Sequence, residues 1–368
     1  MAAMEPSPTR DLAHDQNSPK NIPFDLTFEI LSRLPAKSII RFQSVSKLWS
    51  SIIRSKDLAD SFLIHSKTRP RLLFTFKHFD SRQRFIFSAP EHDTEENSST
   101  ARHDMTISDL VYYIKSRPVN GLICCTRGSS IAVCNPTTRQ ILKLPDEHFV
   151  FTLGCQRQEW RKIEFIDVGD PYTDVKGGVC ISGGIYYVIG HKKIARFDVR
   201  SEKVELINAP QEDMLNEEDI KKVIVYHSSD DISTINAHCW TLVNHQGKLG
   251  GTDYKEFRLM RLWIQEEEDE SWNIMTCDVP TEWGDLFIDK GLSSTGEIHT
   301  GEVMLVSDTL ESSKPFTVYY YDMIRESFRS ATVEGIADSE FRRGIHGFGK
   351  RNRDMLCFPG HIENIMFF

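Results

Sequence analysis

The change of hydrophobic period at Pro70 limits what this chain can fold into more than any other feature. From Asn21 up to Pro70, apolar residues recur at spacings of three and four, the period of helices that bury one face. From Pro70 to Phe368, short apolar runs alternate with polar turns rich in Gly, Pro, Asn and Asp. We therefore expect a small helical unit followed by a much larger unit of strands.

The helical unit is predicted to contain three or four short helices. Leu26, Ile30 and Leu34 recur at spacing four, and Pro35 should end the first helix because proline cannot continue one. Pro23 is expected in the first helical turn, where its missing N–H costs nothing. Ser38 and Asp57 are expected to be the N-caps of the second and fourth helices. Val45 is expected to lie in the third helix.

The helical unit has more apolar positions than so small a bundle can hide. A domain of about 45 residues is marginally stable alone, and an apolar surplus on it indicates a surface that something else covers. A partner protein and the following strand domain are equally compatible with the pattern. Periodicity does not distinguish between these two possibilities.

After Pro70, two strands around a polar turn form a repeated unit, often followed by proline. The paired runs are 72–76 with 84–87, 131–134 with 140–144, 149–153 with 159–163, 194–197 with 204–207, 258–264 with 272–277, and 317–321 with 327–333. Several pairs follow a glycine-bearing strand, and the unit returns roughly every 45 to 70 residues. This rhythm predicts a mainly antiparallel, β-propeller-like domain with degenerate blades, with a large β-sandwich as the alternative.

One interval is too short for this rhythm. The turns at Pro136 and Gln156 lie only about twenty residues apart, which leaves no room for the inner strands of a blade. Either two hairpins belong to one blade, or the chain lacks a strand pair there.

Charge and apolar content exclude several classes of protein. A net charge of −9 argues against binding nucleic acid by phosphate neutralisation. The N-terminus lacks the order of a signal peptide, and no apolar run approaches the length of a membrane span. Residues 1–18 hold little to bury and are expected to be a disordered tail. We expect a protein of the cytoplasm or the nucleus.

Catalytic and metal-binding patterns find no support. The run from Gly347 to Lys350 lacks the spacing of a phosphate-binding loop, and no nucleophile or zinc-protease motif occurs. None of the 13 histidines pairs at i, i+4 on a convincing helix, and none of the 8 cysteines forms a C-x-x-C pair. We expect no enzyme, no metal, no cofactor and no disulfide framework, with the cysteines serving as small buried hydrophobes.

Large aromatic rings have a default structural role here. Trp160 and Trp272 follow turns, where each ring could pack one blade against its neighbour. Trp283 lies between strand runs and is the better candidate for a substrate-binding loop.

The run from Ile22 to Trp49 carries seven short elements in a fixed order. They are Ile-Pro, Glu-Ile-Leu, Arg-Leu-Pro, Lys-Ser, Arg-Phe, Val-Ser-Lys and the final Trp. In this order they resemble the F-box of plant F-box proteins, and the resemblance assigns residues 19–66 to that domain.

The remainder, residues 70–368, resembles the propeller-like F-box-associated interaction domain of the same proteins. The residues that carry this resemblance lie at 119–124, 133–140, 144–145, 160–161, 180–187 and 197–198. In that family a Gly-Phe/Tyr-Asp-Pro and Tyr-Lys-Val segment usually follows the Leu-Pro pair, and it is missing between Pro145 and Phe149. The expected fold class is therefore an α + β multidomain protein, with a helical F-box before a β-propeller-like domain that could lack part of one blade.

The resemblance implies the substrate-receptor subunit of an SCF-type cullin–RING ubiquitin ligase. Its F-box would bind a Skp-type adaptor, and through it cullin and the RING protein, while the C-terminal domain would recruit a protein target. Matching the motif position by position gives the expected adaptor contacts or their immediate support as Pro23, Leu26, Ile30, Leu31, Leu34, Pro35, Ile39, Val45, Lys47 and Trp49. The alternatives are a non-degradative F-box protein that sequesters a partner, and a propeller enzyme acting on a small molecule.

Overall fold

The structure is a computed structural model of the whole chain, and it describes most of the two expected units. The described residues are 23–78, 83–91, 98–108, 113–114, 117–127, 130–144, 149–150, 161–162, 175–189, 193–210, 241–255, 259–266, 271–278, 292–307, 309–311, 316–336, 351–353 and 355–368. The expected tail at 1–18 and the candidate Trp283 lie outside them.

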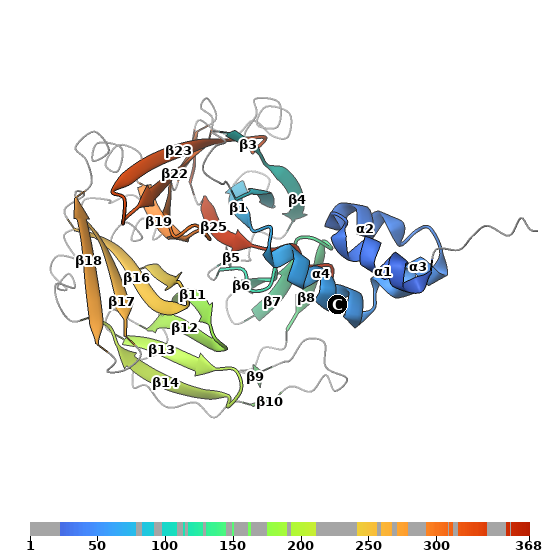
Figure 1. Cartoon of the computed structure of the whole chain (residues 1–368), viewed down its shortest axis with the longest axis horizontal. Coiled ribbons are helices and arrows are strands. Elements are labelled where there is room, and N and C mark those ends of the chain that lie inside the picture. The colour runs from blue at the N-terminus through green and yellow to red at the C-terminus, as the bar shows by residue number, and fades with distance from the viewer. Residues whose placement is uncertain are drawn as a thin grey trace, which may run out of the picture.

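Four helices form a compact bundle beside a ring of strands (Figure 1). They are α1 (Phe24–Arg33), α2 (Ala36–Phe42), α3 (Lys47–Ile53) and α4 (Lys56–Lys67). Four short helices were within the prediction, and Pro35 does follow the end of the first one. Only residues 68–70 separate α4 from the first strand.

The helix starts differ from the prediction at both prolines. Pro23 precedes α1 as its N-cap, and its carbonyl accepts the N–H of Thr27 at 2.9 Å. The second helix begins directly after Pro35, so Ser38 lies inside it and caps nothing. The extended backbone of proline (ψ near 140°) with its fixed φ suits the position before a helix, which explains both shifts.

Serine hydroxyls set the starts of the last two helices. Ser55, and not Asp57, caps α4 by accepting the N–H of Leu58 at 3.3 Å. Ser46 caps α3 in the same way, so Val45 lies before that helix and not within it. In each case the serine hydroxyl accepts a hydrogen bond from the backbone N–H three residues later, which has no partner within the helix.

Among the described residues, five antiparallel blades follow one another around a ring, which confirms the propeller and excludes the sandwich (Figure 1). Four of them are four-stranded sheets, and the fifth has four antiparallel strands with one parallel strand added at its edge. We number them as blades in chain order, each from its inner strand outward. Blade 1 is β25 (Leu356–His361), β1 (Arg71–His78), β2 (Gln83–Pro90) and β4 (Arg102–Ile107); blade 2 is β5 (Tyr113–Ile114), β6 (Ile123–Arg127), β7 (Ser130–Asn135) and β8 (Gln140–Lys143); blade 3 is β11 (Val175–Ile181), β12 (Gly184–Ile189), β13 (Lys193–Asp198) and β14 (Lys203–Asn208); blade 4 is β15 (Thr241–His245), β16 (Lys248–Lys255), β17 (Leu259–Gln265) and β18 (Trp272–Asp278); blade 5 is β19 (Leu292–Glu297), β20 (Val303–Ser307), β22 (Phe316–Asp322) and β23 (Ser327–Glu334).

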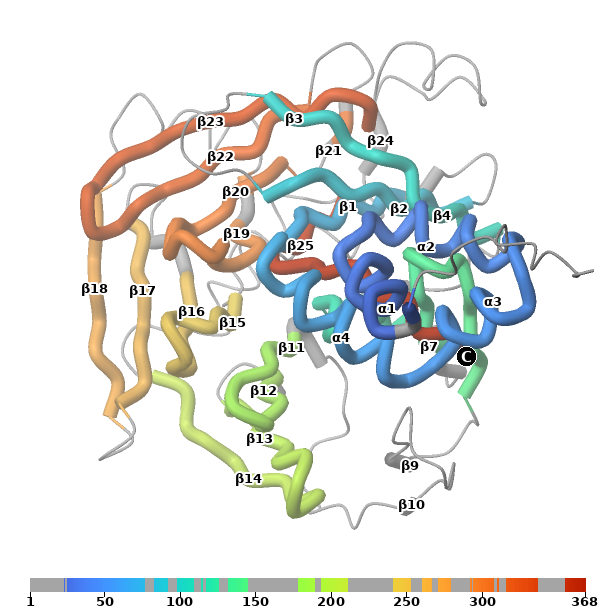
Figure 2. Tube along the Cα trace, turned by 45° about the vertical axis from the view of Figure 1, so that its right-hand side comes forward, coloured from blue at the N-terminus to red at the C-terminus, as the bar shows by residue number. Residues whose placement is uncertain are grey.

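Two strands tie the first blade to the last part of the chain (Figure 2). β25 completes blade 1 by pairing with β1, so residues far apart in sequence share one sheet. β3 (Ser98–Thr100) leaves blade 1 and pairs in parallel with β23, on the outside of blade 5. A further pair, β21 (Thr309–Glu311) with β24 (Arg351–Arg353), forms a small separate sheet.

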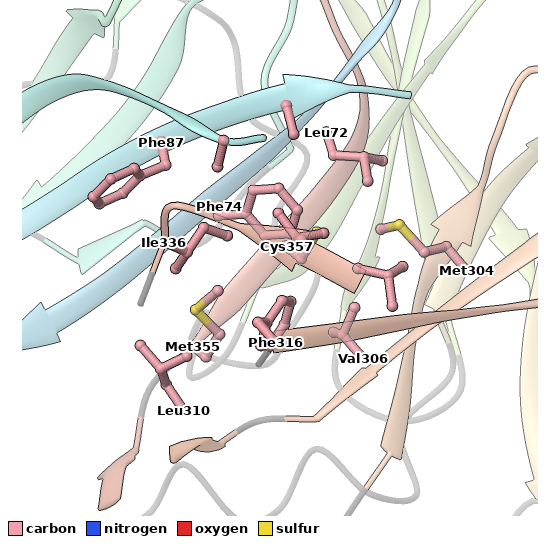
Figure 3. Close-up of a cluster of buried hydrophobic side chains, with 14 of the residues drawn as sticks. Leu72, Phe74, Phe87, Met304, Val306, Leu310, Phe316, Ile336, Met355 and Cys357 are labelled. Atoms are coloured by element: carbon pink, nitrogen blue, oxygen red, sulfur yellow. The ribbon is translucent and has the colours of Figure 1, made fainter. Parts of the chain in front are cut away.

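Consecutive blades share apolar cores, with one exception. Buried clusters join blades 5 and 1 (partly shown in Figure 3), blades 4 and 5, blades 1 and 2, and blades 3 and 4. Across the described residues, none joins blades 2 and 3. There the short hairpin β9 (Phe149–Val150) and β10 (Arg161–Lys162) forms its own sheet. This hairpin joins neither blade 2 nor blade 3, each of which has four strands of its own among the described residues.

The turn between the third and fourth strands repeats in blades 2, 3 and 5. Asn135, Asp198 and Asp322 each begin it, and their Oδ1 atoms each accept two backbone N–H groups at 2.7–3.3 Å. The fifth residue of each turn has a positive φ: Arg139, Glu202 and Glu326. These side chains therefore hold the same turn in three blades.

The predicted packing role of Trp272 is confirmed. Its ring packs against the core between blades 3 and 4, and its Nε1–H donates to the carbonyl of Asn208 at 3.1 Å. Trp160 lies outside the described residues.

Glu91 links three elements where the ring closes, and its removal is expected to be costly. Its buried carboxylate accepts the N–H of His299 at 2.9 Å and that of Gly360 at 3.0 Å. In Glu91→Ala both donors lose this partner, so we expect the free energy of unfolding to fall by about 2–3 kcal/mol. Urea unfolding followed by tryptophan fluorescence measures this. The exposed Glu334→Ala is the control, with an effect within about 0.5 kcal/mol, and equal losses in both variants would contradict the prediction.

Candidate functional site

The helical bundle exposes large apolar side chains on α1 and at the start of α3. Leu26 and Ile30 are 55% and 48% exposed, and Val45 and Leu48 are 61% and 64% exposed. Leu26 and Ile30 lie four residues apart on α1 and so share one side of that helix. We call these four residues the exposed apolar set. Such side chains lose free energy in water and gain it in an interface.

The opposite side of α1 packs into the core of the bundle. Leu31, Ile39, Ile53 and Phe62 are completely buried there. The motif residues therefore fall into two groups. Pro23, Leu26, Ile30, Pro35, Val45 and Lys47 are exposed, whereas Leu31 and Ile39 are buried and Leu34 and Trp49 pack partly buried against the core.

Trp49 anchors the bundle. Its ring meets that of Phe42 edge to face, with centroids 5.4 Å apart, which joins α3 to α2. Its backbone N–H is the one that Ser46 caps, at 3.1 Å. These contacts give Trp49 a structural role in the bundle.

The core of the bundle is completed from the far end of the chain. Residues 362–368, which we call the C-terminal segment, run from blade 1 to the helices. Ile365 is completely buried in the helical core, Phe367 packs against it, and the guanidinium of Arg54 lies 5.2 Å from the Phe367 ring. Sequence reasoning missed these residues. Their only signal was an apolar alternation too short to indicate what it packs against.

The sequence left two possibilities for what buries the apolar surplus of this bundle, a partner protein or the rest of the chain, and the structure bears on both. One side of the helices is covered by the chain itself, through the C-terminal segment. The exposed apolar set remains at the surface and is available to another molecule.

In a pocket of the propeller, charged side chains pair with neighbouring charged side chains. A cavity of about 170 Å³ between blades 4 and 5 is lined by His245, Thr300, Asp322 and Arg325 among others. The Glu297 carboxylate lies 2.9 Å from His245 Nδ1 and raises the pKa of that histidine. Asp322 caps its turn and lies 3.5 Å from Arg325. Because these charges already pair within the protein, we interpret the residues that line the pocket as structural.

The described residues offer no cluster of metal ligands, no disulfide and no membrane-spanning helix. No three His, Cys, Asp or Glu side chains there are placed to hold a metal ion. The six cysteines that the structure describes are free thiols, four of them buried. No described helix has the length and apolarity to cross a membrane.

A four-helix bundle with an exposed apolar set, joined to a β-propeller, defines a protein of two parts. Residues 20–60 match the F-box domain family, and residues 71–148 and 144–362 match the F-box associated beta propeller domain family. The chain belongs to the F-box proteins that carry this propeller.

Curated relatives share this layout along nearly their whole length. F-box protein At1g30790 of Arabidopsis thaliana is 32% identical over 94% of this chain and 98% of its own length. F-box protein At5g65850 of the same species is 33% identical over 94% of this chain and 90% of its own length.

The comparisons also bear on the short interval after Pro145. Blade 3 needs only residues 175–208. The two stretches that match the propeller family meet at 144–148, next to the place where blades 2 and 3 share no described core. The junction of the two matched stretches thus falls at the short interval after Pro145.

Proposed function

We propose that this protein is the substrate receptor of an SCF-type cullin–RING ubiquitin ligase. The observation that carries the proposal is the exposed apolar set on a domain of the F-box family. In the proposed complex the F-box binds a Skp-type adaptor, which connects it to cullin and the RING protein. The propeller binds a protein target.

The proposed mechanism needs no catalytic residue in this chain. A receptor that holds a target near a ubiquitin-loaded conjugating enzyme raises the effective concentration of the target's lysines. Rate is gained by proximity, so the receptor's task is to bind at two places. The paired charges in the described pocket are consistent with this role and give no support to a small-molecule enzyme.

The adaptor interface is tested by Leu26→Asp combined with Ile30→Asp. Both side chains are exposed, so the bundle should stay folded while adaptor binding weakens roughly thirtyfold or more. Titration calorimetry of the full chain with a Skp-type adaptor measures the dissociation constant, and circular dichroism checks folding. Leu206→Asp, which changes an exposed leucine on β14, is the matched control. Unchanged affinity in the double variant would remove these residues from the interface.

Reconstitution separates this function from sequestration of a partner without degradation. A complex of receptor, adaptor, cullin and RING protein that transfers ubiquitin supports the ligase. Stable adaptor binding without cullin recruitment supports sequestration. We further propose that the protein works in the cytoplasm or the nucleus, which imaging of a fluorescent fusion tests.

A further inference from the structure

Asn135 differs from its counterparts in the repeated blade turn. Asp198 and Asp322 begin the same turn in blades 3 and 5. All three residues cap it through Oδ1, so the cap alone does not require an amide. The amide nitrogen of Asn135 instead donates to two carbonyl oxygens of the C-terminal segment, those of Asn364 at 3.0 Å and Met366 at 2.9 Å. A carboxylate could not make these bonds, because it has no hydrogen to donate.

Further hydrogen bonds with two of the turns of blade 2, those between β5 and β6 and between β7 and β8, hold the same segment. The N–H of Asn364 donates to Thr137 Oγ1 at 3.1 Å, and its side-chain amide donates to the carbonyl of Asn120 at 2.7 Å. The N–H of Phe368 donates to Gln140 Oε1 at 3.1 Å. The buried Asn135 lies at the centre of this set.

The C-terminal segment uses alternate residues for its two neighbours. Asn364, Met366 and Phe368 bond to blade 2, whereas Ile365 and Phe367 pack into the helical core. This is the period of an extended chain with a different partner on each side. The segment thus connects the F-box to the ring at a second place, in addition to the three residues between α4 and β1.

We propose that the C-terminal segment is a clasp that fixes the orientation of the F-box relative to the propeller, with Asn135 as its positioning residue. A three-residue connection alone leaves rotation open at its backbone dihedrals, and a second attachment removes that freedom. The proposal deepens, and in its functional part rests on, the proposed receptor role. In a receptor, this orientation sets where a bound target lies relative to the conjugating enzyme.

Asn135→Asp tests the clasp in the full-length chain. The substitution keeps Oδ1 as the turn cap, as in blades 3 and 5, but places a carboxylate oxygen against two carbonyls. Amide exchange in residues 364–368 should accelerate roughly tenfold or more, because two hydrogen bonds are lost. The distance distribution between spin labels on noncanonical residues at Lys37 and Glu205, both exposed, should broaden.

Asp198→Asn is the matched control. It makes the reciprocal change in the equivalent turn of blade 3, where Asp198 bonds to groups of its own turn and to Arg196. Slow exchange and a narrow distance distribution should persist in this control. Unchanged exchange and an equally narrow distribution in Asn135→Asp would overturn the clasp.

A second variant covers the case in which Asn135→Asp unfolds blade 2. Asn364→Ala removes the donor to Asn120 and the acceptor for the N–H of Met366, and leaves the blade turn unaltered. It should broaden the same distance distribution with an unchanged thermal transition of the ring. An unbroadened distribution here would also overturn the proposal.

The functional consequence is read from self-ubiquitination in the reconstituted ligase. Asn135→Asp should bind the adaptor within about twofold of the wild type, since the exposed apolar set is untouched. The lysines modified, mapped by mass spectrometry, should change. An unchanged lysine pattern in a variant with a broadened distance distribution would refute the positioning role. Failure of the wild type to bind adaptor would refute the proposed function, and the exchange and distance results would still decide the clasp.

Discussion

Replacing Gly121 by alanine should lower the free energy of unfolding by roughly 3 kcal/mol and release the C-terminal segment. Gly121 has a φ of +79°, which alanine adopts only with strain. A Cβ there would also lie 2.4 Å from the carbonyl oxygen of Ile362 and 2.9 Å from Cβ of Asn364. The first of these contacts is with backbone, so no side-chain rotation relieves it. Urea unfolding and amide exchange of residues 362–368 measure both effects.

The same turn in blades 3 and 4 supplies the control. Gly183 and Gly247 have φ values of +81° and +91°, and a Cβ at either would meet nothing within 4 Å. Gly183→Ala and Gly247→Ala should therefore lose only the conformational part, about 1 kcal/mol each. If all three variants lose the same stability, contact between Gly121 and the C-terminal segment contributes nothing.

The second large effect is acid sensitivity caused by His361. Burial, followed by the nearby charges of Arg71 and Arg102, lowers the pKa of this histidine to about 3. The unfolded chain takes up this proton near pH 6.5, whereas the folded chain does not until about pH 3. Stability from this group is therefore complete above pH 6.5 and is lost as pH falls. The slope approaches about 1.4 kcal/mol per pH unit, or roughly 2–3 kcal/mol between pH 6.5 and 4.5.

His361→Gln isolates this contribution, because glutamine does not titrate. The other groups near it, Asp104, Glu363, Arg71 and Arg102, are the same in both proteins and cancel in the comparison. The unfolding free energies of wild type and variant, measured by urea at half-unit pH steps, should converge as pH falls from 6.5 to 4.5. Parallel curves would show that His361 does not titrate on unfolding in this range.

The helices and strands of this fold could be predicted from the sequence because burial of one face spaces the apolar residues periodically. The helical period before Pro70 and the alternation after it are direct consequences of burying one helix face or one strand face. The short interval after Pro145 was visible for a related reason, since a blade needs a minimum length of chain. The helix starts were less predictable, because Ser55 and Asp57 are both good caps and only geometry selects between them.

Contacts between distant segments could not be predicted in this way. Ile365 and Phe367 alternate like any short strand, and nothing in that pattern identifies the helical core as their partner. Asn135 belonged to a run that resembled the family, yet its donor role depends on which carbonyls lie opposite. The exposed and buried motif residues also separate only once the helices are packed, as Leu26 and Leu31 illustrate.

The dependence of the helical core on Ile365 has a consequence for how the protein is made. A ribosome completes the four helices roughly 300 residues before it adds Ile365 and Phe367. During translation the nascent helices lack part of their core, and blade 1 lacks β25. A chain released early would therefore carry a weakened helical bundle together with an open ring. Full-length synthesis is therefore needed to complete both the helical core and blade 1.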